Sequence, residues 1–193
     1  MKYIVKPALT LFITAVIVVA ALSVVYNFTY EPIERQKRKT RETVLKHVMP
    51  QASVYREIEV EKTGSITAVF EALAENELIG YAVQMSPEGY SGKIDFMVGF
   101  SIPYKHITGL RVMRHTETPG LGALVVNESF YKRYNYMPLS PLRVVKTNPG
   151  AGEIQALTSA TITTNAITNA VNEAIEWYLA MEGDSLIKEG EEE

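Results

Sequence analysis

A polar run introduces the last long helical pattern of the chain and reads QALTSATITT at residues 155–164. After it, apolar residues recur at helical spacing over residues 165–181 and predict an amphipathic helix. Hydroxyl groups at a helix start accept hydrogen bonds from backbone N–H groups that have no partner inside the helix. The same N–H groups, with the positive end of the helix dipole, favour a bound phosphate. The run therefore predicts a helix N-cap, a phosphate site or both.

Before this run the hydrophobic pattern has a period of two, which is typical of strands. Five strands are predicted in succession, at residues 54–60, 65–74, 78–85, 93–100 and 107–114. Turn-forming residues separate them, so we expect an antiparallel, meander-like sheet. A helix is predicted next over residues 124–134 and a short strand over 142–147. No boundary interrupts residues 54–181, which we expect to form one α+β domain with helices packed on a mainly antiparallel sheet.

The N-terminal part of the chain contains a long uncharged stretch, ALTLFITAVIVVAALSVVY at residues 8–26. A helix needs about 20 apolar residues to cross a hydrocarbon core roughly 30 Å thick. The stretch is apolar on all sides and longer than the apolar region of a cleaved signal peptide. We therefore expect one transmembrane anchor in contact with membrane lipid within residues 1–30. Residues 31–53 predict a stalk helix and linker, and residues 182–193 an acidic tail.

Composition excludes several classes of function. The chain has no Cys and only three widely spaced His residues, which argues against iron–sulfur and zinc sites, so no metal is expected. Only Lys2 and Lys6 of the 19 basic residues precede Glu31, whereas all 22 acidic residues lie at or after it. The body is therefore acidic, which argues against nucleic-acid binding. Basic residues are more numerous after the apolar stretch than before it, and that count alone favours a cytoplasmic body.

Two further segments have the composition of ligand-binding loops. HTETPGLG at residues 115–122 follows a predicted strand, and its glycines let the backbone approach a ligand closely. GYSG at residues 89–92 places Tyr90 between two glycines, where its ring could face a planar ligand. In isolation, an ordinary turn explains each segment. Together with a helix start suited to phosphate, they suggest a phosphorylated planar cofactor.

These segments together resemble the FMN-binding domain of the G subunit of Rnf ion-translocating complexes and of its relative, the C subunit of the sodium-pumping NADH:quinone reductase. The resemblance covers nearly the whole chain, and HTETPGLG is its most specific part. It implies FMN bound covalently, as a phosphoester to the last Thr of a D-x-x-[ST]-G-A-[ST] motif. That Thr is Thr161 here. The chain departs from the motif at two positions, with Gln155 in place of the Asp and Ser159 in place of the Gly.

The resemblance implies a flavin site built from all three segments. The expected cofactor-binding residues are Thr158, Ser159, Ala160, Thr161, Thr163, Thr164, Glu117, Thr118, Gly120, Leu121, Gly122 and Tyr90. Thr161 would carry the phosphoester, and the hydroxyls of Thr163 and Thr164 would join the backbone N–H groups around the phosphate. No catalytic residue is expected, because the redox chemistry belongs to the cofactor.

The same resemblance implies an electron-relay subunit without substrate turnover of its own. The complex would move electrons between reduced ferredoxin and NAD+ and translocate Na+ or H+. Implied partners are the other membrane and redox subunits and a flavin transferase, with the domain outside the cytoplasm on the cell (inner) membrane. Two alternatives stay open: a structural subunit that has lost FMN through Gln155 and Ser159, and an extracytoplasmic sensor domain that binds a free ligand.

Overall fold

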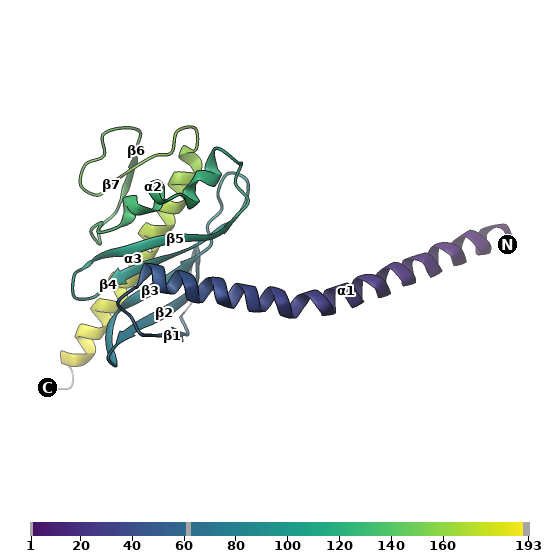
Figure 1. Ribbon diagram of the computed structural model, residues 1–193, viewed down its shortest axis with the longest axis horizontal. Coiled ribbons are helices and arrows are strands. Elements are labelled where there is room, and N and C mark those ends of the chain that lie inside the picture. Colours follow the sequence, from purple (N-terminus) through teal and green to yellow (C-terminus); the bar gives the residue numbers. More distant parts are fainter. Residues whose placement is uncertain (1, 61–62, 191–193) are drawn as a thin grey trace. The chain divides into compact units, whose positions relative to one another are not determined.

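The computed structural model describes residues 2–60 and 63–190 (Figure 1). Residue 1 of the predicted anchor and residues 191–193 of the predicted acidic tail lie outside the described residues. The chain forms two compact units, Met1–Glu42 and Thr43–Glu193. The division between them falls inside the first helix, α1 (Lys2–Val48).

The first unit consists of the N-terminal part of α1. One segment of this helix is long and apolar enough to cross a membrane. Its hydroxyls bond to carbonyls one turn earlier, as between Thr10 and Lys6 at 3.0 Å, which removes their demand for water. The sequence predicts an anchor and a separate stalk helix, but α1 continues through Pro32. The charged residues that follow are strong helix formers and include the pair Arg35–Glu31, four residues apart.

The second unit is built on a five-stranded antiparallel sheet in the order β1-β2-β3-β4-β5. Its strands are β1 (Val54–Ile58), β2 (Ile66–Ala74), β3 (Glu77–Met85), β4 (Ile94–Ser101) and β5 (His106–His115). Each predicted strand matches one of these within two residues at either end. The predicted α+β fold with a mainly antiparallel sheet is confirmed.

The segments after the sheet differ from the prediction in detail. The single helix expected over residues 124–134 is three short pieces: η1 (Gly122–Val126), α2 (Glu128–Tyr131) and η2 (Lys132–Tyr134). Asn127 separates the first two because its backbone is extended, with φ −74° and ψ 144°. The short strand β6 (Arg143–Val145) pairs in parallel with β7 (Glu153–Gln155), which the hydrophobic pattern did not indicate.

The last helix, α3 (Thr161–Gly190), is longer than predicted at both ends. It begins four residues before position 165, because the amide of Thr164 already donates to the carbonyl of Ala160 at 3.0 Å. It also continues into the acidic tail, where Glu and Lys residues have good helix propensity.

Both faces of the sheet are buried. On one face, side chains such as Phe96 and Val98 pack with the apolar stripe of α3, which lies along the sheet in Figure 1. On the other face, Met97 and its neighbours pack against Val48 and Met49, where α1 ends. Full burial of one large apolar side chain contributes about 1.5–3 kcal/mol. The two layers therefore fix α3 against the sheet and define where its first turn lies.

Candidate functional site

A cavity of about 430 Å³ lies where the first turn of α3 meets the loops after β3 and β5. It is lined by Tyr90, Glu117, Thr118, Leu121, Gly122, Ser159, Ala160, Thr161, Ile162 and Thr163. Nine of the twelve predicted cofactor residues are among these, and Ile162 is an addition. Three segments that are far apart in the sequence thus meet around one cavity.

Glu117 connects these segments from a buried position. The residue is 5% exposed, and its carboxylate accepts hydrogen bonds from the Ser91 amide at 2.9 Å and from the Thr163 hydroxyl at 2.6 Å. The first bond holds the GYSG loop and the second holds the first turn of α3. Bonds to a charged acceptor are roughly twice as strong as neutral ones. Glu117 therefore fixes the two loops and the helix start relative to one another.

The two Gly-rich loops contact each other through further polar groups. The Thr116 hydroxyl donates to the Ser91 carbonyl at 3.2 Å, and the hydroxyls of Ser91 and Thr118 are 3.4 Å apart. Tyr90, the residue before Ser91, lines the cavity and remains 70% exposed. Its ring is therefore available to a ligand at the mouth of the cavity.

The loop glycines make room for the buried carboxylate. A Cβ on Gly122 would lie 2.3 Å from Oε2 of Glu117 and 2.8 Å from the Thr163 hydroxyl. A Cβ on Gly89 would lie 2.4 Å from Oε1 of Glu117. Any larger residue at either position would push the carboxylate out of its place, so close approach explains these two glycines.

The hydroxyls of the polar run have different roles in the structure. Thr163 donates to Glu117, and the buried Thr164 hydroxyl donates to the Ala160 carbonyl at 3.0 Å while it accepts from the Leu157 amide at 3.1 Å. A hydroxyl has one proton. In this arrangement neither Thr163 nor Thr164 has a proton left for a phosphate, which differs from the role that the sequence suggested for them.

Thr161 differs from both. It is the first residue of α3, it lines the cavity, and no hydrogen bond engages its hydroxyl within the described part of the chain. The α3 hydrogen-bond ladder starts at the Thr164 amide, so the amides of Thr161, Ile162 and Thr163 precede it. A free hydroxyl and three helix-start amides therefore lie at one cavity.

Three predicted site residues do not line the cavity. Thr164 is buried beneath it, whereas Thr158 and Gly120 are exposed beside it. Gln155, one of the two departures from the motif, also lies outside the lining, and its side chain bonds to the Lys146 carbonyl at 3.4 Å.

Ser159, the other departure, lies in the cavity lining with a positive φ of 64°. This left-handed conformation costs a residue with a Cβ roughly 1–2 kcal/mol. Glycine adopts it readily, which explains the Gly in the motif. The serine is therefore a strained replacement at a position where the backbone favours glycine.

Several supporting residues were not predicted from the sequence. The Thr168 hydroxyl donates to the Thr164 carbonyl at 2.9 Å, so the buried Tyr134 hydroxyl donates to Thr168 at 2.8 Å. Burial raises the pKa of Tyr134, above all through desolvation. Arg133 donates to the Gln155 carbonyl and holds β7 against η2. Of these contacts, the sequence could have indicated only the bond from Thr168 to Thr164, because the two residues are four positions apart at the start of a predicted helix.

A second cavity, of about 370 Å³, includes none of the predicted residues. Its lining is mainly apolar and aromatic and comprises Met49, Pro50, Gln51, Ile79, Ser101, Tyr104, His106, Thr108 and Tyr136. His106 begins β5, whereas the loop of the first cavity follows the end of that strand. No cluster of three or more metal-binding side chains occurs in the described residues.

Comparison with known proteins identifies the family. Residues 89–176 match a family model described as an FMN-binding domain, and residues 1–48 match one described as the RnfG N-terminal region. The G subunit of the Na+-translocating ferredoxin:NAD+ oxidoreductase complex of Acetobacterium woodii is 32% identical over 195 residues, 92% of each chain. The chain belongs to the RnfG family. Another RnfG relative, the G subunit of the ion-translocating oxidoreductase complex of Methanosarcina acetivorans, is 27% identical and covers 94% of this chain and 98% of its own.

Solved structures agree with the fold. NqrC of Shewanella oneidensis superposes with a TM-score of 0.57 at 16% identity, over 70% of this chain and 91% of its own. The C subunit of the Na+-translocating NADH-quinone reductase of Parabacteroides distasonis gives a TM-score of 0.59 at 15% identity, over 76% and 94%. These similarities confirm the predicted FMN-binding fold.

RnfG membership gives the cavity and the N-terminal helix their general roles. All three cavity segments lie within the matched FMN-binding domain, so the chain is a flavoprotein subunit of an electron-transport complex. The N-terminal helix is its membrane anchor. The cavity fits the cofactor, since it has the volume of a small-molecule site, helix-start amides for a phosphate and Tyr90 for a ring.

Proposed function

We propose that this chain carries FMN as a phosphoester on Thr161 and relays electrons within an Rnf-type complex. The observation that carries the proposal is the different bonding of the three threonine hydroxyls in the first turn of α3. Thr163 and Thr164 are committed to Glu117 and Ala160, whereas the Thr161 hydroxyl is unengaged and lines the cavity. Only an unengaged, accessible hydroxyl can form an ester without breaking a contact that the fold uses.

The residues of the chain would divide the binding of FMN between them. The amides of residues 161–163 would hold the phosphate at the start of α3. Tyr90 would lie against the ring system, and Thr118, Leu121 and Gly122 would line the cavity around it. FMN itself supplies the electron transfer, while the protein orients it and shields it from water.

Its role in the complex is inferred from the relatives. The G subunit of the proton-translocating ferredoxin:NAD+ oxidoreductase complex of Clostridium ljungdahlii is 30% identical over 176 residues. Together with the Acetobacterium woodii protein, it supports electron transfer between ferredoxin and NAD+, coupled to Na+ or H+ translocation. The partners would be the other membrane and redox subunits of the complex, membrane lipid around α1, and a flavin transferase.

We further propose that the domain lies outside the cytoplasm. A carrier on that side would lose a dissociating cofactor, and a covalent bond prevents this loss. The excess of basic residues after the anchor points the other way, but large translocated domains follow such counts poorly. Protease added to intact spheroplasts should digest the domain. Digestion that occurs only after lysis would place it in the cytoplasm.

The test of attachment compares Thr161 with a threonine outside the motif. The full chain is coexpressed with a flavin transferase, denatured and separated by electrophoresis, and flavin fluorescence is recorded on the band. Thr161→Ala should abolish the fluorescence. Thr147→Ala should retain it, because Thr147 is exposed and lies outside both the motif and the cavity lining. Fluorescence that survives Thr161→Ala contradicts the assignment.

One observation favours a second candidate, a structural subunit without FMN. Ser159 places a Cβ in a left-handed backbone conformation within the motif that a transferase would have to recognise. The intact mass of the wild-type chain decides between the two. An FMN increment in the presence of the transferase supports the electron carrier, and its absence supports the structural subunit.

A further inference from the structure

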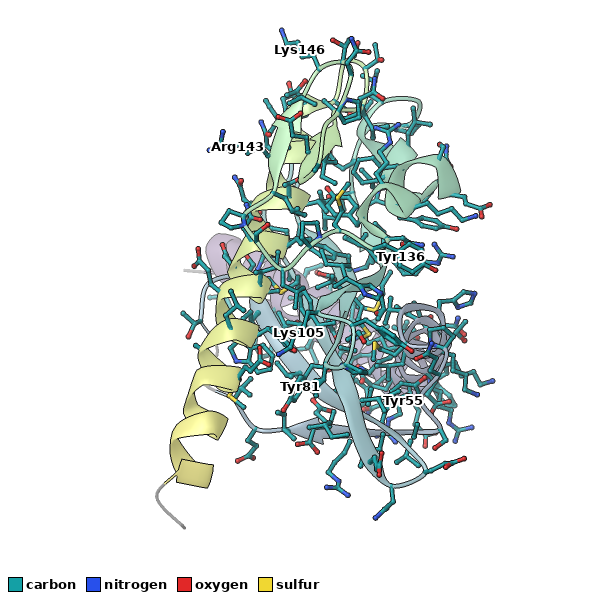
Figure 2. All side chains as sticks on the ribbon, turned by 90° about the vertical axis from the view of Figure 1, so that its left-hand side faces the viewer. Tyr55, Tyr81, Lys105, Tyr136, Arg143 and Lys146 are labelled. Carbon is teal, nitrogen blue, oxygen red and sulfur yellow. The ribbon has the colours of Figure 1, made fainter. Side chains whose placement is uncertain are left out.

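The cavity at the start of α3 contains a carboxylate but no cationic side chain. Among the ten described residues that line it, Glu117 is the one carboxylate, and none is Lys, Arg or His. Arg143 and Lys146 project outward from β6 and the loop after it, and neither lines the cavity (Figure 2). Proteins commonly recognise phosphate groups with Arg or Lys. This cavity therefore lacks the usual counter-charge for a free phosphate monoester.

The hydroxyl beside the carboxylate makes the site less favourable still for such a group. Thr163 gives its proton to Glu117, so its oxygen can present only lone pairs to the cavity. The helix start contributes about half a positive elementary charge, which Glu117 already offsets. An incoming phosphate would meet three amides but also a full negative charge and an acceptor oxygen.

We propose that Glu117 makes this cavity selective for FMN in its tethered form and against free FMN. The inference rests on the proposed attachment at Thr161. A phosphate monoester carries a charge of roughly −1.5 to −2 at pH 7. A diester with a threonine has one ionisable oxygen and a single charge. Since the repulsion from Glu117 scales with the ligand charge, it opposes the free cofactor more strongly than the attached one.

The covalent bond to Thr161 also makes occupancy of the cavity by FMN less dependent on its intrinsic affinity. A covalently held ligand stays at a high effective concentration and tolerates a repulsion that a free ligand cannot overcome. The unmodified chain would thus reject free FMN and other phosphate monoesters and leave Thr161 accessible to the transferase. Glu117 acts here as a specificity-determining residue of the binding site.

The substitution Glu117→Gln isolates the charge. The amide oxygen can still accept from the Ser91 amide, and the amide nitrogen can donate to the Thr163 oxygen. The Thr163 proton is then free to point into the cavity. Both contacts between the loops remain, the negative charge is gone, and one donor is added. Glu176→Gln is the matched control, since it makes the same change of net charge at an exposed position of α3.

The experiment uses the full chain in detergent, produced without a flavin transferase. Equilibrium dialysis measures the affinity for FMN and for riboflavin, which has the same ring system without the phosphate. The wild type should bind riboflavin at least as tightly as FMN. Glu117→Gln should bind FMN at least about tenfold more tightly than the wild type and Glu176→Gln, with little change for riboflavin.

Three results would overturn the proposal. The first is a wild type that binds FMN more tightly than riboflavin, which needs no variant to interpret. The second is an FMN affinity that Glu117→Gln leaves unchanged, including one that is immeasurable in every protein. The third is an equal gain for riboflavin and FMN, which would indicate a change of shape rather than of charge.

The proposed function is tested separately on the same proteins. Intact mass after coexpression with the transferase reports attachment, whatever the free ligands do. A wild type that acquires FMN on Thr161, beside a Glu117→Gln variant without a gain for free FMN, leaves the attachment standing and removes only the selectivity. A wild type that acquires no FMN removes the proposed function itself.

Discussion

The two cavities of the folded unit are similar in volume but different in construction. The one at the start of α3, of about 430 Å³, joins three distant segments through a buried carboxylate and has helix-start amides in its lining. The other, of about 370 Å³ beside the start of β5, is lined mainly by apolar and aromatic side chains such as Tyr104 and Tyr136. Volume alone does not distinguish them. The first cavity differs by its helix-start amides and the unengaged Thr161 hydroxyl, and these groups suit a phosphorylated cofactor.

The largest effect on stability is expected when the carboxylate of the first cavity is removed. Glu117→Ala leaves the Ser91 amide and the Thr163 hydroxyl without their acceptor. Unfolding free energy should fall by about 3 kcal/mol. Denaturant unfolding of the full chain measures it, with Glu176→Ala as a control that should stay within about 0.5 kcal/mol. An equal loss in both variants would mean that Glu117 does not hold the loops together.

The next largest effect concerns the buried Tyr134, whose hydroxyl bonds to Thr168 of α3, and the stability of the protein at alkaline pH. Because burial raises the pKa of Tyr134, the folded protein keeps the phenol proton that the unfolded chain loses near pH 10. The stabilisation is complete below pH 10 and is lost as pH rises toward the folded pKa. The slope is about 1.4 kcal/mol per pH unit.

Tyr134→Phe should remove this part of the alkaline slope, as seen by thermal unfolding at several alkaline pH values. The same variant loses the bond to Thr168, so a constant offset of about 1 kcal/mol is expected at neutral pH. An alkaline slope identical to that of the wild type would contradict a buried phenol in this position.

A smaller change, an increase in stability, is expected when Ser159 is replaced by glycine. Ser159→Gly removes the Cβ from a residue with φ 64° and should stabilise the chain by about 1 kcal/mol. Covalent flavin per chain should be equal to or higher than that of the wild type. The control is Thr158→Gly at the exposed neighbouring position, and it should not stabilise. Destabilisation by Ser159→Gly would show that the backbone there does not require glycine.

The smallest effect is expected in the second cavity. Tyr136→Ala changes a side chain that is 77% exposed, so stability should move by less than about 0.5 kcal/mol. Flavin attachment, measured as absorbance per chain after denaturation, should be unchanged. A loss of attached flavin would mean that the two cavities are coupled and that their separation is mistaken.

Much of the fold could be predicted because the pattern is local. The five strands follow from alternation within each segment, and α3 follows from its apolar stripe. β7 has three residues, too few for a period to appear. The break at Asn127 is a single extended residue inside a helical pattern, which periodicity does not detect.

The sequence indicated which segments line the candidate site, but not which hydrogen bonds connect them. Gly, Tyr and hydroxyl residues indicated the three segments by composition. The bond between Glu117 and Thr163 joins residues 46 positions apart, and only the packing of α3 against the β5 loop creates it. The positive φ of Ser159 is likewise a property of the folded backbone. The assignment of each hydroxyl therefore required the structure.

The central claim is that Thr161 carries the cofactor, and localisation of the modification tests it most directly. The wild-type chain is coexpressed with a flavin transferase and digested with trypsin, which leaves residues 147–188 as one peptide. Tandem mass spectrometry then places the added mass within that peptide. The account predicts FMN on Thr161. FMN on Thr158, Ser159 or Thr163, or a peptide without FMN, would contradict it.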